Sequence, residues 1–363
     1  MAEEASRLGP YVRLEGITIR QLPPDGQGVK PANLPPLPEN AADKAKGVAT
    51  PDLKTFVTNV IVEGTSFIDG VAPKDGSAST WKAKGSPKKY ASSHAPVYLH
   101  ARTVPSSALN KIEGMGKAYE RKDETWFCRR SCHQNKADRG TASWDEFKHS
   151  FKEHHAETEE AFTPTVIGAR EAIRWDAGGI ELETQGQRWT NISVAVEEMK
   201  HKIDPKPLKN RTFPVAQVTA ELAGVQEFII ISIPLTDFQN SPYAEYARDK
   251  SLVVAKYTSI ERIRVLPGSG EVEWLMATAS DAGGVLPHWM QNLAVPSAVA
   301  KDVELFLGWI PSQRKGKPSD SKAADSDPPP APSNGETPKA DSQKDDQPPS
   351  EPAGDEPTAN GEH

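Results

Sequence analysis

The chain has 363 residues, enough for one large domain or two small ones, and only 36% of them are hydrophobic. Its formal net charge of −7 comes from its last part, because residues 318–363 carry 11 acidic residues against 3 lysines, with no aromatic or branched aliphatic residue. Residues 1–317 therefore carry a formal charge of +1, which excludes the basic surplus typical of a general nucleic-acid binder.

The sequence also lacks the marks of membrane and secreted proteins. The sequence contains no run of about 18 apolar residues, so no membrane span is predicted. The acidic start Met1–Glu4 is not followed by the apolar stretch of a signal peptide. The two cysteines, Cys128 and Cys132, exclude a disulfide framework. We therefore expect a cytoplasmic protein.

Residues 1–50 are predicted to form a flexible, proline-rich segment. Seven prolines and no aromatic residue fall within residues 21–51, a composition that disfavours a packed core. The run Leu34–Pro38 can adopt polyproline II and meet an aromatic groove of a protein partner. The preferred interpretation of this run is nevertheless a plain linker.

Two helices are predicted in the first half of the chain. Apolar residues recur at helical spacing over residues 52–68, and Pro51 stands where that helix would begin. Residues 70–95, rich in glycine, lysine and serine, are predicted to form a loop. The second helix is predicted from Ser143 to about residue 161, because Ser143 and Glu146 form a capping box at its start.

Strand-like segments dominate the rest of the chain. Their apolar patterns predict strands over residues 97–103, 124–134, 165–175, 180–183, 189–201, 211–222, 227–235, 252–266 and 271–280. The segment 189–201 also suits a helix. A last amphipathic helix is predicted over residues 286–310, kinked at Pro296. This order is an α+β pattern, in which short turns make consecutive strands antiparallel.

Several segments together resemble a known family. The run Ser280–Asn292 resembles the closing segment of START domains, where an acidic residue and glycines precede a proline and an aromatic residue at the start of the C-terminal helix. Residues 124–131, 140–147, 259–262 and 271–281 resemble a fungal branch of this superfamily whose function is unassigned. The resemblance implies a helix-grip START-like fold over residues 51–311: a curved antiparallel sheet closed by a long C-terminal helix around a lipid-sized cavity. Residues 312–363 are predicted to be a disordered, acidic, proline-rich tail.

The hairpin around residues 266–271 predicts which side chains would line such a cavity. If Leu266 faces Glu271, the ladder places Arg262, Arg264, Glu273 and Leu275 on one face, which suits solvent. The opposite face is the predicted inner wall. It carries Tyr257, Glu261, Ile263, Trp274, Met276 and Thr278, and it would face Trp289, Val299, Val303 and Phe306 of the last helix.

Glu261 is the one acid on this predicted wall, so it should find a cation or become neutral. Arg130 is the expected partner because it shares a strand face with Trp126, and Arg129 is the alternative if that face assignment slips by one residue. A buried Arg–Glu pair would recognise a lipid hydroxyl or headgroup. The competing interpretation places both residues at a wet sheet edge.

The basic loop at residues 200–211 is a candidate membrane contact. Its position matches the loop that gates the cavity in START domains. The residues expected to contact an anionic leaflet are Lys202, Ile203, Lys206, Leu208 and Lys209. An ordinary solvated loop is the alternative.

Metal and catalytic motifs are weak by comparison. Cys128 and Cys132 would share a strand face about 13 Å apart, too far for one zinc ion. His149, His154 and His155 lack the His-Glu-x-x-His spacing, so a solvated helix face is the preferred interpretation. No P-loop, nucleophile elbow or dinucleotide fingerprint is present. We expect no metal and no cofactor.

Three functions are compatible with this sequence. The leading prediction is binding, with possible transfer between membranes, of a lipid or sterol-class ligand in an internal cavity, which needs no covalent chemistry. The second is a cyclase- or hydrolase-like enzyme that uses a cavity carboxylate such as Glu261 as a general base. The third is an adaptor whose two disordered ends recruit protein partners.

Overall fold

The computed structural model describes residues 8–23, 29–30, 52–71, 79–115, 121–204, 207–284 and 288–314. For residues 29–30 and 288–293 it describes the backbone alone. The chain divides into two units, Met1–Lys317 and Pro318–His363, and all described residues belong to the first. The motif Leu34–Pro38, Lys206 and the tail from residue 315 onward lie outside the described residues.

A twelve-stranded sheet forms the centre of the described fold, as the α+β pattern predicts. Its order is β1-β5-β7-β8-β9-β11-β12-β4-β3-β2, with β6 on β7 and β10 on β8. Every pairing is antiparallel except the one between β10 and β8. The strands are β1 Val29–Lys30, β2 Lys82–Ala83, β3 Tyr98–Val104, β4 Glu124–His133, β5 Val166–Trp175, β6 Leu182–Thr184, β7 Gln187–His201, β8 Arg211–Leu222, β9 Glu227–Pro234, β10 Val253–Val254, β11 Lys256–Val265 and β12 Val272–Asp281.

The helices lie near their predicted positions. The longer elements are α2 Leu53–Asp69, α5 His155–Phe162 and α6 His288–Arg314, with short helices at α3 Ser106–Leu109 and α4 Trp144–Phe147. Asp52 caps α2 by accepting a hydrogen bond from the backbone N–H of Thr55. The capping box of Ser143 and Glu146 starts α4 as predicted. The mid-chain helix is not continuous, however, because a π-helical segment, η4 Lys148–Glu153, separates α4 from α5.

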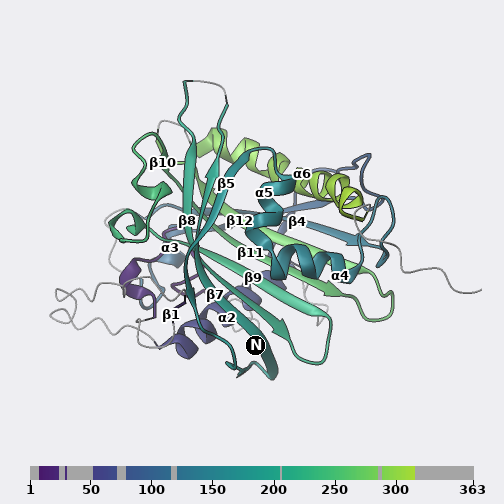
Figure 1. Cartoon of the computed structure of the whole chain (residues 1–363), viewed down its shortest axis with the longest axis horizontal. Helices are drawn as coiled ribbons and strands as arrows, with labels where there is room; N and C mark the ends of the chain where they lie inside the picture. The colour runs from purple at the N-terminus through teal and green to yellow at the C-terminus, as the bar shows by residue number, and fades with distance from the viewer. Residues whose placement is uncertain are drawn as a thin grey trace, which may run out of the picture. The chain divides into compact units, whose positions relative to one another are not determined.

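The two faces of the sheet are covered by different helices (Figure 1). Helix α2 packs on one face, where Trp126, Leu275 and Ile260 belong to the same apolar cluster as Phe56. Helices α4, α5 and α6 cover the other face. We call these the α2 face and the α6 face. None of the described helices is long and apolar enough to cross a membrane.

The prediction that Arg262, Arg264, Glu273 and Leu275 face solvent is wrong. Helix α2 covers this face, and Glu273 and Leu275 are both 0% exposed. Arg264 and Glu273 form an ion pair on this face, with 2.6 Å between Nε and Oε2. Arg130 adds a second ion pair to Glu273 at 2.7 Å, and Arg262 pairs with Asp69 of α2. The α2 face therefore buries a charged network beside its apolar core.

Residues 8–23 are packed against the domain, so the predicted flexible segment does not extend over them. Val12, Ile17 and Leu22 are at most 2% exposed. Glu63 of α2 accepts hydrogen bonds from the backbone N–H groups of Tyr11 and Val12, both at 2.9 Å. Burial raises the pKa of the Glu63 carboxyl to about 7. This docking depends on contacts between distant parts of the chain, which a local composition does not reveal.

Candidate functional site

The ladder of the sheet fixes which residues share the α6 face. Leu266 N–H donates to the Glu271 carbonyl, and Ile263 pairs with Trp274 and Glu261 with Met276, as the hairpin predicts. Cross-strand partners share a face. The α6 face therefore carries, from β7 to β3, Glu197, Phe213, Gln217, Phe228, Ile230, Ser232, Tyr257, Ser259, Glu261, Ile263, Trp274, Met276, Thr278, Phe127, Arg129 and Leu99.

One end of this face, next to the β8–β9 and β11–β12 turns, is filled by aromatic side chains. The Trp274 ring lies 5.5 Å from Phe306 of α6 and 4.8 Å from Phe151 of η4, measured between ring centroids. Ile263 and Val303 belong to the same apolar cluster, and both are 0% exposed. Four predicted wall residues thus come together in a solid core, which leaves no room for a ligand among them.

The other end of the face is not filled in this way. Tyr257 on a central strand is partly exposed there, and so is Phe213 beside it. Met276 is also partly exposed, and it lies nearer the middle of the face, between Glu261 and Arg129 on the ladder. The rings of Phe213 and Tyr257 meet edge to face at 5.5 Å. Thr278 is 5% exposed, and its hydroxyl donates to the Thr258 carbonyl. Parts of the Phe213 and Tyr257 side chains therefore remain accessible at this end of the sheet.

The other two predicted helix residues, Val299 and Trp289, have different outcomes. Val299 of α6 is 6% exposed and does not belong to the cluster around Trp274. Trp289 lies in the first turns of α6, where only the backbone is described.

Arg129, the alternative partner, holds Glu261. Its Nη2 lies 3.1 Å from Oε1 of Glu261, and its guanidinium carbon lies 3.8 Å from the centroid of the Trp274 ring. Trp274 Nε1 donates to the same carboxylate oxygen at 2.5 Å. Burial alone would raise the pKa of Glu261, but the positive charges of His155 and Arg129 outweigh it and hold the pKa below its ordinary value.

The prediction that Arg130 and Trp126 belong to the inner wall is wrong. Arg130 pairs with Leu275 across the ladder, and Trp126 packs in the cluster on the α2 face. The alternation along β4 is as predicted, but the wrong set of side chains was assigned to the wall. Because β4 joins β12 without a connecting hairpin, no turn in the sequence fixes which of its faces points to α6.

His155 is the second cation beside Glu261, and it was missed. Its Nε2 lies 3.8 Å from Oε2 of Glu261. Burial would lower the pKa of His155, but the nearby carboxylates of Glu261, Glu159 and Glu197 raise it to about 9. The sequence placed His155 on a solvated helix face, because helical spacing cannot anticipate the π segment that turns it toward the sheet.

Further acids surround this pair of cations. Asp302 of α6 lies 3.8 Å from Nε of Arg129, and burial raises its pKa to about 7. Burial raises the pKa of Glu197 to about 6, and Gln217 donates to this carboxylate at 3.2 Å. A polar cluster thus crosses the middle of the α6 face, between the aromatic core and the accessible end. None of these acids is marked by a local sequence signal.

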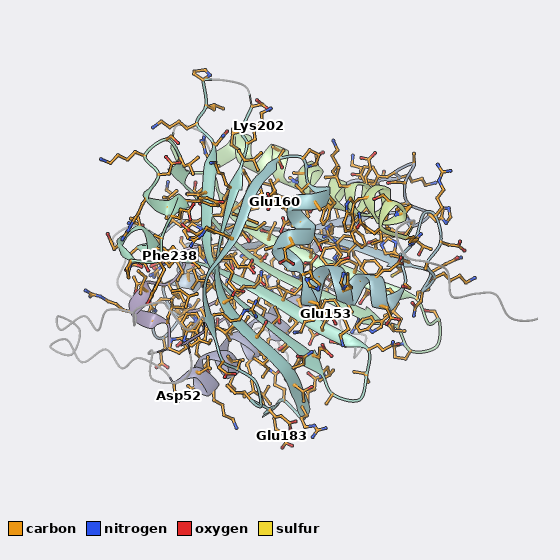
Figure 2. All side chains as sticks on the ribbon, in the orientation of Figure 1. Asp52, Glu153, Glu160, Glu183, Lys202 and Phe238 are labelled. Atoms are coloured by element: carbon orange, nitrogen blue, oxygen red, sulfur yellow. The ribbon has the colours of Figure 1, made fainter. Side chains whose placement is uncertain are left out.

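The basic β7–β8 loop lies at the accessible end of the sheet, where Figure 2 labels Lys202. Lys202 and Lys209 are exposed, and Ile203 and Leu208 are partly exposed. Lys202 pairs with Asp204 at 2.9 Å, and Lys209 Nζ donates to the Lys250 carbonyl at 3.0 Å. His201 at the start of this loop packs on Phe213 with ring centroids 5.1 Å apart, so the loop continues directly into that end of the face.

The described residues offer little for covalent chemistry. His133 Nε2 lies 2.8 Å from Ser131 Oγ, but both residues are 1% exposed beneath the aromatic core. Burial lowers the pKa of His133 to about 3 and raises the pKa of the Cys128 thiol to about 12. A substrate cannot reach the first pair, and the thiol is unreactive.

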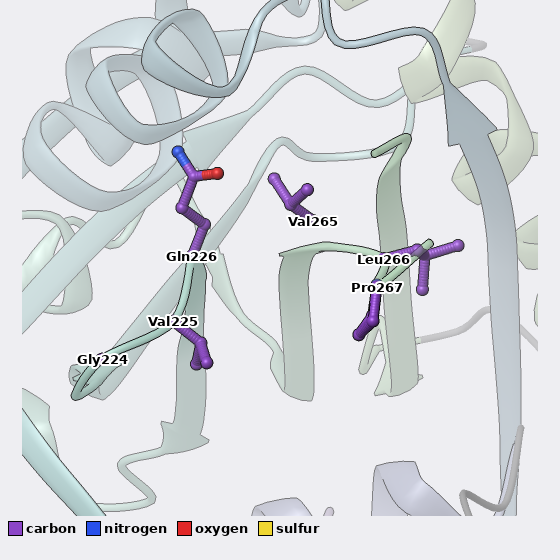
Figure 3. Close-up of a pocket in the computed structure, with 6 residues that line it drawn as sticks. All are labelled: Gly224, Val225, Gln226, Val265, Leu266 and Pro267. Atoms are coloured by element: carbon purple, nitrogen blue, oxygen red, sulfur yellow. The ribbon is translucent and has the colours of Figure 1, made fainter. Parts of the chain in front are cut away.

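One surface pocket lies at the opposite end of the sheet (Figure 3). It has a volume of about 570 Å³ and lies between the β8–β9 and β11–β12 turns. Its lining residues are Gly224, Val225, Gln226, Val265, Leu266 and Pro267. None of the predicted wall or loop residues lines it.

Comparison with known proteins gives the family of the chain. Residues 126–310, just over half of the sequence, match the family model described as "Protein of unknown function (DUF3074)". The chain belongs to this family. A search of the curated proteins found no match.

Among solved structures, the DUF3074 chain is similar to START-domain proteins, the superfamily that its sequence resembles. Human STARD10 is 17% identical, with 74% of this chain and 85% of that chain covered and a TM-score of 0.43. Human StAR-related lipid transfer protein 5 is 12% identical, with 69% and 98% covered and a TM-score of 0.42. The lipid transfer and protein localization domain of human StarD13 is 10% identical, with 63% and 88% covered and a TM-score of 0.37.

Proposed function

We propose that this protein binds one lipid or sterol-class molecule between the accessible end of the α6 face and helix α6. The wall of the site is formed by Met276, Tyr257, Thr278, Phe213 and Phe127. The closing elements are the first turns of α6 and the β7–β8 loop. No covalent step is needed, because the site replaces a bilayer as the surroundings of the ligand.

The partial exposure of Met276 and Tyr257 is the observation that carries this proposal. Both residues lie on central strands, under the face that a long helix covers, where a solid core would bury them completely as it buries Trp274. A hydrophobic ligand that covers them would gain about 25 cal/mol for each Å² of apolar surface removed from water.

The polar cluster would set the depth and the orientation of the ligand. Glu261 and Arg129 lie on the α6 face between the aromatic core and the accessible end. The Nη1 of Arg129 is buried and makes no hydrogen bond within the described structure. A ligand hydroxyl or headgroup oxygen that accepted a hydrogen bond from this atom would be recognised at the inner end of the site.

The β7–β8 loop would be the point of contact with an anionic membrane. Its exposed lysines would be attracted to anionic headgroups, and Ile203 and Leu208 could enter the interface. Because the loop continues into the accessible end of the face, its movement at a membrane would open the route for ligand exchange.

The test is lipid extraction followed by native mass spectrometry. The purified protein is incubated with liposomes that contain phospholipid and sterol, recovered and weighed intact, and its bound lipid is identified by lipidomics. We expect one lipid for each chain. Met276→Glu should reduce the bound fraction at least about tenfold, because a carboxylate would be buried against the acyl chain or ring system.

Ile167→Glu is the matched control, since Ile167 is 43% exposed on β5 and the same charge there meets water. This variant should retain the ligand. The proposal fails if the wild-type protein extracts neither phospholipid nor sterol, or if a folded Met276→Glu variant binds as much lipid as the control.

A further inference from the structure

The π segment η4 lies between α4 and α5, over the α6 face of the sheet (Figure 1). Its bond from the His154 backbone N–H to the His149 carbonyl, at 3.1 Å, spans five residues. In an α-helix, two positions five residues apart point about 140° away from each other. The wider π turn brings them to the same side. Such segments are rare and are often found at functional sites.

Three metal-binding side chains gather on the outer side of this turn. One donor atom each from His149, Glu153 and His154 lies within 4.8 Å of the others. His149 Nδ1 is 3.5 Å from Glu153 Oε2, and the two imidazole rings have centroids 4.5 Å apart. The three side chains are exposed by 64%, 47% and 48%. An ion from solution can therefore reach them, and Figure 2 labels Glu153 on this segment.

The chemistry of this set matches a borderline transition metal. Two imidazoles and one carboxylate form a ligand set that Zn²⁺ and neighbouring divalent ions accept, whereas Ca²⁺ and Mg²⁺ prefer oxygen ligands alone. Glu157 Oε2 lies 2.9 Å from His154 Nδ1. A carboxylate that accepts the proton of Nδ1 orients the ring and leaves Nε2 as a lone-pair donor, as is common around metal-bound histidines.

The inner side of the same turn explains why the geometry is held. Phe151 packs with Trp274 and Phe306 at 4.8 Å from each ring, and His155 contacts Glu261. These buried contacts fix the turn from below. The side chains of His149, Glu153 and His154 are exposed and take no part in this core. Packing therefore does not explain why they lie close together.

We propose that His149, Glu153 and His154 bind a divalent transition-metal ion of the Zn²⁺ class, with water in the remaining coordination positions. The bound ion joins His149 to His154, five residues later in the chain, and so stabilises the π segment over the aromatic core. This site is separate from the proposed lipid site and does not depend on it.

The test uses the untagged full chain, stripped with a chelator and titrated with Zn²⁺ by calorimetry and with Co²⁺ by visible absorption. We expect one ion for each chain, with Co²⁺ bands of a site that contains nitrogen ligands. His149→Ala and His154→Ala should each abolish stoichiometric binding. Glu157→Gln should weaken binding about tenfold through the orientation of His154.

His94→Ala is the control, because His94 is exposed on a different part of the surface. It should bind the ion as the wild-type protein does. As an independent readout, Zn²⁺ should raise the melting temperature of the wild-type protein and of His94→Ala, but not that of His149→Ala. The proposal is overturned if wild type binds no ion at millimolar Zn²⁺, or if binding persists unchanged in both His149→Ala and His154→Ala.

Discussion

Glu261 shows how a charge is kept inside a largely apolar layer. Removing one partner from a buried ion pair is usually costly, because the other charge is left without solvent. Here two cations from different elements share the task, Arg129 from β4 and His155 from α5. Of these two cations, His155 is the one that loses its charge as the pH rises through about 9. The stability of the helical layer therefore depends on pH.

This connection gives the first prediction. The pKa of His155 is raised from 6.5 to about 9 in the folded protein. A raised pKa means that the imidazolium stabilises the fold fully below pH 6.5, and that this contribution is lost as pH rises through about 9. We expect His155→Gln to lower the free energy of unfolding by about 3 kcal/mol below that range and by much less above it.

Urea unfolding of the wild-type protein and of His155→Gln, at a series of pH values between about 6 and 10, measures the difference. His94→Gln serves as the control for loss of an exposed histidine. A constant difference in the free energy of unfolding across this range would show that the charge of His155 has no role in stability.

At the scale of elements, the β7–β8 loop is the part of the sheet that we propose contacts an anionic membrane. The loop connects two long neighbouring strands and carries Lys202 and Lys209 on its exposed side. The ion pair of Lys202 with Asp204 reduces its net charge in solution. An anionic membrane surface would still attract both lysines, at about 1 kcal/mol each.

We therefore expect the double variant Lys202→Glu/Lys209→Glu to bind phosphatidylserine vesicles at least about tenfold more weakly in a sedimentation assay. The double variant Lys54→Glu/Lys136→Glu makes the same change of charge at exposed positions outside the loop. Equal binding by both double variants would mean that net charge alone, and not the loop, determines membrane contact.

At the scale of the whole molecule, the N-terminal residues 8–23 complete the layer on the α2 face. The side chains of Val12, Ile17 and Leu22 are buried, and Arg13 Nη1 lies 3.1 Å from Glu124 of β4. The segment also reaches β9, since Ile17 N–H donates to the Pro234 carbonyl at 2.9 Å. It therefore joins α2, β4 and β9, three elements far apart in the sequence.

Deleting residues 1–23 should reduce the free energy of unfolding by about 5 kcal/mol or more, because three buried aliphatic side chains and two buried ion pairs or hydrogen-bonded carboxylates are lost. Thermal unfolding followed by circular dichroism measures this loss. Deleting residues 1–7 alone leaves every contact described for this segment in place and should have little effect. Equal melting temperatures for the two deletions would contradict this role.

The sequence predicted the parts of the fold that depend on local patterns. The hairpin of β11 and β12 has the expected register because a short turn joins its strands, so Glu261 was placed correctly beside Met276. The capping box at Ser143 was also visible, since it depends on residues three positions apart. The sequence of segment 189–201 suits a helix or a strand. It forms strand β7, because pairing with β5 and β8 favours the strand.

Features that depend on distant contacts could not be predicted. The pairing of β4 with β12 joins Ser131 to Trp274, and nothing between them fixes the face, so Arg130 was preferred over Arg129. The π segment inserts a wider turn that helical periodicity does not represent, so His155 was placed on the solvated side. The candidate site was therefore predicted only in part: Tyr257, Glu261 and Met276 share the expected face, whereas Arg129 was only the alternative partner and His155 was not expected.

The short outer strands of the sheet have a consequence for self-association. The edge strands β1 and β2 have two residues each, so β1 pairs only with Trp175 and Arg174 of β5 and leaves most of that strand without a neighbour on its outer side in the described residues. An open strand edge can template the addition of another chain. Along β5, however, two register shifts interrupt the ladder, and Arg170 and Glu171 place charges beside it. Both features oppose a regular edge-to-edge pairing of β5 with another chain.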